Sequence, residues 1–306
     1  APFILSPHSP TRLYMAANKV FRSDDRGQSW TIISGDITTQ VDRNTWEVMG
    51  HDWSADAVGK DVSTSLYGTG VALAESPLKA DLVYVGTDDG LIQITEDAGQ
   101  NWYKASKFPG VPEYTYVSDV VPDRFDANIV YASFDNIRRN DFKPYIFKST
   151  DKGKSWESIV GNLPENHTVL SIAQDFVDPD LLFAGTEFGL FFSIDGGKIW
   201  TQIKSGLPTI KVFDITIQER ECDLVLATFG RGFYILDDYS PLRELSKETR
   251  EKESFIFPVK DALMYTQDGG LYGQGSNFFY APNPPYGSTF TYYLKDVPKM
   301  LKEVRK

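Results

Sequence analysis

Cysteine, histidine and long apolar runs are scarce in this sequence, and each scarcity excludes a class of protein. Its 306 residues include one cysteine, Cys222, and three histidines. A disulfide framework and a cysteine-ligated zinc site are therefore excluded. No apolar run reaches the ~18 residues that a membrane-spanning helix needs. The amino-terminal residues lack the basic segment and cleavage site of a signal peptide. We expect no metal and no cofactor.

Positive charge is scarce as well. Lysine and arginine total 31 against 42 aspartate and glutamate residues, so the formal net charge is −11. Because such a surface repels a phosphate backbone, nucleic acid is not an expected partner. An acidic surface most often only keeps a protein dispersed, although it suits neutral or cationic ligands.

Aromatic residues, glycine and proline are plentiful, which predicts many short strands joined by tight turns. One pattern, Ser/Thr-x-Asp-x-Gly-x-x-Trp, here called the repeat motif, recurs along the chain. It occurs four times, at Ser23-Asp25-Gly27-Trp30, Thr95-Asp97-Gly99-Trp102, Ser149-Asp151-Gly153-Trp156 and Ser193-Asp195-Gly197-Trp200. Four occurrences of an eight-residue pattern indicate an internal repeat.

The chemistry of the repeat motif predicts a turn rather than an active site. Its aspartate can accept hydrogen bonds from backbone N–H groups of the turn, and its glycine can adopt the positive φ of a tight hairpin. The hydroxyl adds a local cap, and the tryptophan opens the next strand. We therefore assign the four motif aspartates a structural role.

Strand-like segments surround each motif and predict an all-β fold. Around the second motif, four strands are expected near Val71–Ala74, Leu82–Gly86, Leu91–Thr95 and Trp102–Ala105. Four short antiparallel strands per repeat, at spacings of ~40–70 residues, predict a β-propeller. We expect blades at about 2–35, 69–107, 115–162, 168–205 and 212–238, with an insertion at 36–68, so that residues 1–240 form the propeller region.

The fifth repeat contains no motif and only three expected strands, ending at Asp237-Asp238. Because a propeller avoids exposed sheet edges, its fourth strand should come from elsewhere. The candidates are Phe255–Phe257, the residues near Ala1, or a part of the protein outside this sequence. We favour the last, which makes the five repeats part of a larger ring whose remaining blades are a partner.

The tail, residues 241–306, differs in character from the repeats. Ser240-Pro241 predicts the start of a charged helix that runs from Leu242 to about Glu253. Glycine-rich residues 269–275, the proline-rich stretch 282–287 and one strand at 289–294 without an obvious partner follow. These features suggest the start of another domain.

The motifs, together with the segments at 185–191, 140–145 and 228–238, resemble large bacterial BNR/Asp-box repeat proteins of the "glycosyl hydrolase" or sortilin (VPS10) N-terminal-like β-propeller family. The resemblance covers about residues 1–294. It implies an exported, extracytoplasmic protein with further propeller blades, followed by a β-sandwich domain that opens near Asn283. The hydrolase label in that family derives from the shared motif and is not evidence of activity here.

Two classes of function remain open. A glycoside hydrolase needs two carboxylates flanking a sugar, and the best candidates are Glu47, Asp52 and Asp56 beside the aromatic Trp46 and Trp53. A binding module would instead use the loops, and for this role we select Trp46, Trp53, Arg138, Arg139 and Arg231. Tryptophans that only fill a gap and arginines in a solvated loop are the structural alternatives.

We favour a noncatalytic propeller that binds protein, peptide or glycan through loops at the ends of the channel, or that acts as a scaffold. The alternative is a glycoside hydrolase acting on a polysaccharide. A calcium site is not expected, because the motif lacks the regular oxygen ligands and the closing glutamate of an EF-hand loop.

Overall fold

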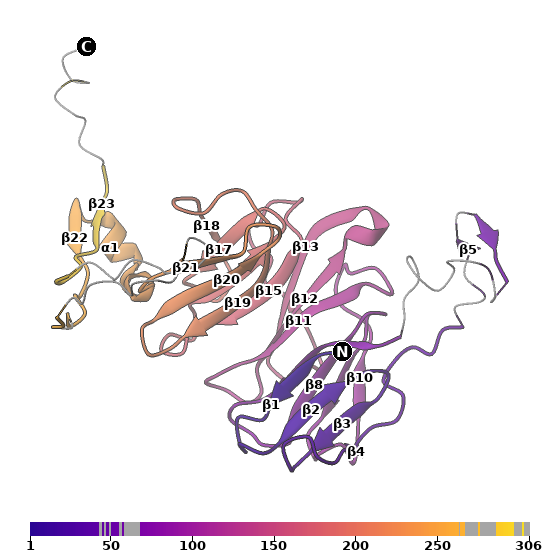
Figure 1. Ribbon diagram of the computed structural model, residues 1–306. Helices are drawn as coiled ribbons and strands as arrows, with labels where there is room; N and C mark the ends of the chain where they lie inside the picture. Colours follow the sequence, from indigo (N-terminus) through magenta and orange to yellow (C-terminus); the bar gives the residue numbers. More distant parts are fainter. Residues whose placement is uncertain are drawn as a thin grey trace. The chain divides into compact units, whose positions relative to one another are not determined.

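Short antiparallel strands make up nearly all the regular structure of the chain. A computed structural model describes residues 1–42, 45, 47–48, 50–54, 57, 68–262, 264–266, 275, 286–296 and 302. The chain divides into two compact units, Ala1–Tyr239 and Ser240–Lys306. In its described part the first unit holds four four-stranded sheets, one three-stranded sheet and a short hairpin (Figure 1).

The five larger sheets, here called blades 1 to 5, each place consecutive strands side by side. Blade 1 consists of β1 (Phe3–Leu5), β2 (Leu13–Ala16), β3 (Val20–Ser23) and β4 (Thr31–Ile32). Blade 2 consists of β7 (Gly70–Glu75), β8 (Val83–Thr87), β9 (Ile92–Thr95) and β10 (Tyr103–Ala105). Blade 3 consists of β11 (Tyr116–Pro122), β12 (Val130–Asn136), β13 (Asp141–Ser149) and β14 (Glu157–Ser158). Blade 4 consists of β15 (Val169–Gln174), β16 (Leu182–Thr186), β17 (Gly189–Ser193) and β18 (Thr201–Ile203), and blade 5 of β19 (Val212–Gln218), β20 (Asp223–Thr228) and β21 (Phe233–Leu236).

The repeat motif forms the turn between the third and fourth strands in blades 1 to 4. In the first copy, the Ser23 hydroxyl accepts a hydrogen bond from the Gly27 N–H at 2.8 Å and donates one to Asp25 Oδ1 at 2.7 Å. Asp25 also accepts from the backbone and hydroxyl of Ser29, which lowers the pKa of Asp25 to about 2. Gly27 has a φ of 86°, which glycine adopts without strain. In the other three copies the hydroxyl again donates to the aspartate and accepts from the glycine N–H, and the aspartate again accepts the backbone N–H four residues later.

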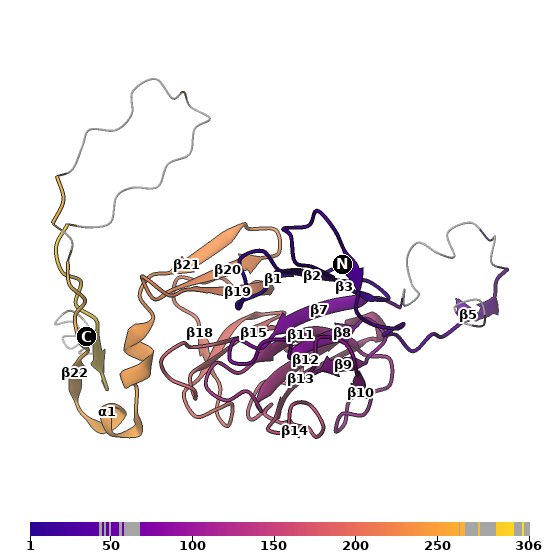
Figure 2. The same cartoon turned by 90° about the horizontal axis from the view of Figure 1, so that it is seen from below.

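The first strands of neighbouring blades pack together, with β7, β11, β15 and β19 in succession (Figures 1 and 2). A β-bulge near the start of each of these strands is followed by a residue that pairs with a small residue of the second strand. The four pairs are Ala72–Gly86, Asp119–Ser133, Ser171–Gly185 and Asp214–Ala227. The small residue leaves room for the next blade to approach closely.

Asp119 links blade 3 to blade 4 through its carboxylate. One oxygen accepts the Ile172 N–H of β15 at 2.8 Å, and the other accepts the N–H of the adjacent Val120 at 2.8 Å. Removal from water raises the pKa of Asp119 to about 7, although both backbone hydrogen bonds oppose the rise. Asp119 is therefore a structural carboxylate with an unusual affinity for protons.

We expect the Gly86→Ala substitution to lower the free energy of unfolding by about 1–3 kcal/mol, the usual cost of overpacking. A Cβ at residue 86 would lie 2.4 Å from Val117 Cγ1 on the first strand of blade 3, so β11 would have to move. Urea unfolding followed by circular dichroism measures the effect. Gly35→Ala is the matched control, since its Cβ would meet nothing within 4 Å, and an equal loss in both variants would contradict the role of this contact.

Blade 5 has three strands, and β21 has no outer partner strand among the described residues. Two of the three candidate sources of a fourth strand pair elsewhere. Residues Ser254–Ile256 form β22, which pairs with β23 (Tyr292–Leu294), and the strand near Ala1 is β1, which pairs with β2. The strand at 292–294, expected to lack a partner, thus has one. The strands β22 and β23 thus form their backbone hydrogen bonds with each other, within the second unit.

The second unit also corrects the expected helix. Its first turn is a 3-10 helix, η3 (Ser240–Glu244), and a separate α1 covers Lys247–Glu251. The chain breaks at Ser246 because its hydroxyl accepts the Thr249 N–H at 3.1 Å and caps a new helix. Residues 269–274 of the predicted glycine-rich segment and residues 282–285 of the proline-rich stretch lie outside the described residues. No helix in the described parts is long and apolar enough to span a membrane.

Candidate functional site

The antiparallel order of the strands gives each blade two distinct ends. Connections between the first and second and the third and fourth strands lie at one end, which carries the repeat motifs. Connections between the second and third strands and between successive blades lie at the other, here called the loop end. The insertion at 36–68, Arg138, Arg139 and Arg231 all belong to loop-end connections. The described residues predicted to bind ligand, Trp53, Arg138, Arg139 and Arg231, therefore lie at the end opposite the motif turns.

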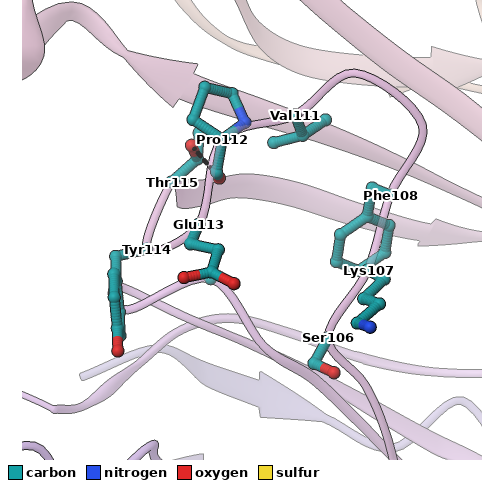
Figure 3. Close-up of a pocket in the computed structure, with 9 residues that line it drawn as sticks. Ser106, Lys107, Phe108, Val111, Pro112, Glu113, Tyr114 and Thr115 are labelled. Carbon is teal, nitrogen blue, oxygen red and sulfur yellow. Dashed lines mark hydrogen bonds between the residues drawn. The ribbon is translucent and has the colours of Figure 1, made fainter.

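A pocket of about 250 Å³ lies at the loop end between blades 2 and 3. It is lined by Gly90 of the β8–β9 turn and by residues of the segment that joins β10 to β11, namely Ser106, Lys107, Phe108, Val111, Pro112, Glu113, Tyr114 and Thr115. Figure 3 shows Lys107 and Phe108 on one limb of this segment and Glu113 and Tyr114 on the other. Ionic, hydroxyl and aromatic groups thus surround one small space.

The loop around the pocket is held by buried anchors. The Phe108 ring is 8% exposed and lies 4.5 Å from the Phe134 ring, within the core between blades 2 and 3. At the other limb, the buried Thr115 hydroxyl donates to the Pro112 carbonyl at 2.7 Å, the dashed line in Figure 3. A Cβ at Gly90 would lie 3.0 Å from the Thr115 nitrogen. The pocket is therefore largely preformed.

Arg138 and Arg139 lie beside this pocket. They form the η2 turn (Ile137–Arg139) between β12 and β13, which ends at Asn140 with a φ of 60°. The Arg138 guanidinium carbon is 5.9 Å from the centre of the Tyr116 ring, and that of Arg139 is 5.8 Å from the centre of the Tyr114 ring. Arg139 Nη1 also donates to the Glu113 carbonyl at 2.6 Å. The two arginines are thus tied to the pocket loop by cation–π contacts and a hydrogen bond.

Asp141 and Asp89 stiffen the surroundings of this site. Asp141 Oδ2 accepts from the Asn136 amide at 2.9 Å and from the Tyr145 hydroxyl at 2.8 Å, which fixes the base of the arginine turn. Asp89 is 3% exposed, and its Oδ2 accepts from both the backbone and the hydroxyl of Thr39 at the start of the insertion. Each of these carboxylates is occupied by hydrogen bonds that hold a loop in place.

The proposed catalytic carboxylates lie elsewhere at the loop end. Within the insertion, β5 (Glu47–Val48) and β6 (His51–Asp52) form a hairpin in which Glu47 is directly opposite Asp52. Both side chains are exposed, and neither lines the pocket at 106–115. Trp53 is 47% exposed, with its ring 6.1 Å from that of His51. Trp46 and Asp56 lie outside the described residues.

Arg231 is exposed in the turn between β20 and β21 of blade 5, two blades from Arg138 and Arg139. The structure therefore groups two of the predicted arginines with residues that the sequence reasoning did not select, namely Lys107, Glu113, Tyr114 and Tyr116. The sequence signal that could have identified this site is the pair Tyr114 and Tyr116, two residues apart, just before the third repeat. In the described ranges, no cluster of three or more histidine, cysteine, aspartate or glutamate residues could hold a metal ion.

The chain is similar to known proteins in sequence and in structure. The chain is 26% identical over 164 residues to an oligoxyloglucan-reducing end-specific xyloglucanase of Emericella nidulans, a match that covers 51% of this chain and 17% of that protein. A GH74 xyloglucanase from Xanthomonas campestris aligns with a TM-score of 0.53 at 12% identity, covering 79% of this chain and 36% of that one. An ancestral GH74 enzyme also aligns at a TM-score of 0.53, with 18% identity, covering 74% of this chain and 27% of its own.

No protein-family model matches the chain. The chain thus spans between about a sixth and about a third of the length of these relatives. The structural likeness, at low identity, shows the fold. Together with the four-stranded antiparallel blades, it establishes a β-propeller architecture.

Proposed function

We propose that this chain is a noncatalytic glycan-binding module of an exported protein, and that the loop end of blades 2 and 3 holds the ligand. The observation that carries this proposal is the preformed pocket at 106–115, which presents a tyrosine ring, a hydroxyl, a carboxylate and an ammonium group at one rim. Sugars are bound by such combinations, because an aromatic face packs against the ring while polar groups exchange hydrogen bonds with its hydroxyls. The similarity to a xyloglucanase over half of the chain supports a carbohydrate rather than a peptide ligand.

A glycoside hydrolase is the second candidate, and one observation favours it. Glu47 and Asp52 are opposite each other on neighbouring strands, where side chains lie roughly 5 Å apart, a separation that suits a retaining mechanism. Against this, both side chains are exposed on a hairpin, whereas a glycosidase acid is usually shielded from water. We therefore rank catalysis second.

Two measurements on the full chain separate these functions. Calorimetric titration with oligosaccharides tests binding, and a reducing-sugar assay on the matching polysaccharides tests cleavage. The module proposal expects heat of binding that Lys107→Ala weakens, with no release of sugar. Release that disappears in both Glu47→Gln and Asp52→Asn would establish the hydrolase instead, and the absence of any glycan binding would refute both candidates.

We further propose that blade 5 packs against another blade of the full-length protein. Asp214 occupies in blade 5 the position that Asp119 has in blade 3, directly after the bulge and opposite a small residue. One of its oxygens accepts the Ile215 N–H at 2.8 Å, as one oxygen of Asp119 accepts that of Val120. Phe233 and Ile235 on β21 are 76% and 59% exposed. A further blade would cover these side chains and supply the second backbone donor.

A further inference from the structure

Arg138, Arg139 and Lys107 are positively charged groups close to the pocket. The chain carries more acidic than basic residues, and four of the described arginines, Arg12, Arg22, Arg124 and Arg220, lie within 4 Å of a carboxylate. Among the described residues, Arg138, Arg139 and Lys107 take part in no such ion pair, although all three are exposed. Three cations without a bound carboxylate therefore lie around one pocket.

The tyrosine rings contact the two guanidinium groups without neutralising their positive charge. Tyr116 and Tyr114 lie about 6 Å from the guanidinium carbons, a contact made through the aromatic face. Arg139 spends one N–H group on the Glu113 carbonyl. A guanidinium has five donors, so most remain free for an external acceptor, and their planar arrangement matches a carboxylate.

The pocket beside the arginines has the opposite character. Glu113 carries a carboxylate at its rim, which repels an anion but accepts hydrogen bonds from sugar hydroxyls (Figure 3). Ser106 and Lys107 add a hydroxyl and an ammonium donor on the facing limb. The volume of about 250 Å³ is below the ~300–1,000 Å³ of typical ligand pockets, so it suits a single ring. A ligand would place its hydroxyls in the pocket and its negative group outside, toward the arginines.

We propose that this site recognises an acidic glycan, a chain of hexuronate units, with a sugar ring in the pocket against Tyr114 and its carboxylate paired with Arg138 and Arg139. The inference rests on the proposed function, because it specifies the ligand of the same site. It differs from the neutral glycan named by the curated relative, an oligoxyloglucan. The net charge of −11 does not prevent such binding, since charges farther apart than about 8 Å are largely screened at physiological salt.

The test is a calorimetric titration of the full chain with a trimer of galacturonate, the matched neutral trimer of galactose, a xyloglucan oligosaccharide and a short polyglutamate. We expect the galacturonate trimer to bind at least about tenfold more tightly than the neutral trimer. Arg138→Ala/Arg139→Ala should raise its dissociation constant by about tenfold or more, as expected for lost charged hydrogen bonds. Arg26→Ala, an exposed arginine in the motif turn of blade 1 at the opposite end of the strands, is the control and should leave it unchanged.

Each other outcome is decisive. Equal binding of the acidic and neutral trimers, or an unchanged constant in the double variant, would overturn the acidic specificity while leaving glycan binding intact. Polyglutamate binding as tightly as galacturonate would overturn the assignment to a sugar, and no binding of any glycan would refute the proposed function itself. The double variant Arg138→Lys/Arg139→Lys controls for misfolding, because it keeps both positive charges but not the planar guanidinium. We expect this variant to bind the galacturonate trimer with intermediate affinity and to have an unchanged melting temperature.

Discussion

Replacing Trp200 by alanine is expected to lower the free energy of unfolding by about 3–5 kcal/mol, the usual cost of removing a buried tryptophan. Its side chain is 3% exposed and lies in the core between blades 3 and 4. Its indole N–H donates to the Ile159 carbonyl at 2.9 Å, so the substitution also leaves a partly buried acceptor without its donor. Urea unfolding followed by circular dichroism measures the loss.

The repeat motif supplies its own control, because Trp30 occupies the same position in blade 1. Trp30 is 38% exposed, and its indole N–H donates to Gly27 within the same turn at 3.1 Å. Because this side chain is partly exposed, its removal creates no buried cavity. Trp30→Ala should therefore lower the free energy of unfolding by at most about 1 kcal/mol. Similar losses in both variants would mean that the tryptophan acts through its turn and not through the contact between blades.

Stability is expected to fall as the pH rises from about 4 to about 7, by an amount on the order of a few kcal/mol, because of Asp119. The pKa of this carboxyl is raised from 3.8 to about 7 in the folded protein. Between these values the folded state retains a proton that the unfolded chain has lost, so lower pH favours folding. Above about pH 7 both states are ionised and the dependence ends.

Asp119→Asn should remove most of this slope when unfolding is compared at about pH 4.5 and about pH 7.5. Asp214→Asn, at the equivalent exposed position of blade 5, should reduce the slope only slightly, because the charge of Asp214 makes the smallest contribution to the raised pKa of Asp119. Asp25, Asp97 and Asp151 of the motif act in the opposite sense but in a more acidic range, because hydrogen bonds lower their pKa values, that of Asp25 to about 2. A slope that survives in Asp119→Asn would show that another group carries it.

The fold was accessible from the sequence because its signals are local. Serine, aspartate and glycine close each turn through bonds spanning two to four residues, so the motif can be recognised without knowing what surrounds it. The all-β propeller class is confirmed on this basis. One prediction was wrong because it depends on pairing over a long distance: no local pattern marks that residues 254–256 pair with 292–294. The single helix from Leu242 was wrong for a local reason, because the Ser246 hydroxyl caps a separate helix.

The candidate site could be predicted from the sequence only in part. Arg138 and Arg139 could be selected because a polar loop interrupts a repeat, but their neighbours Tyr114 and Tyr116 are more than 20 residues away in the chain. Lys107 and Glu113 had no motif to mark them. Glu47 and Asp52 were proposed as a pair, and the hairpin does place them opposite each other, while the predicted role remains a proposal.

By itself, the sequence determined that this protein is built from repeated four-stranded blades and that its most regular aspartates serve turns. Hydrogen bonds within a turn depend only on nearby residues, and these recur visibly along the chain. Only the tertiary structure decided which loops meet at one end, why Asp119 holds a proton near neutral pH, and which cations lie beside the pocket with no carboxylate partner in the described part of the chain. Those properties arise where different blades pack against each other, and no local pattern in the sequence records that contact.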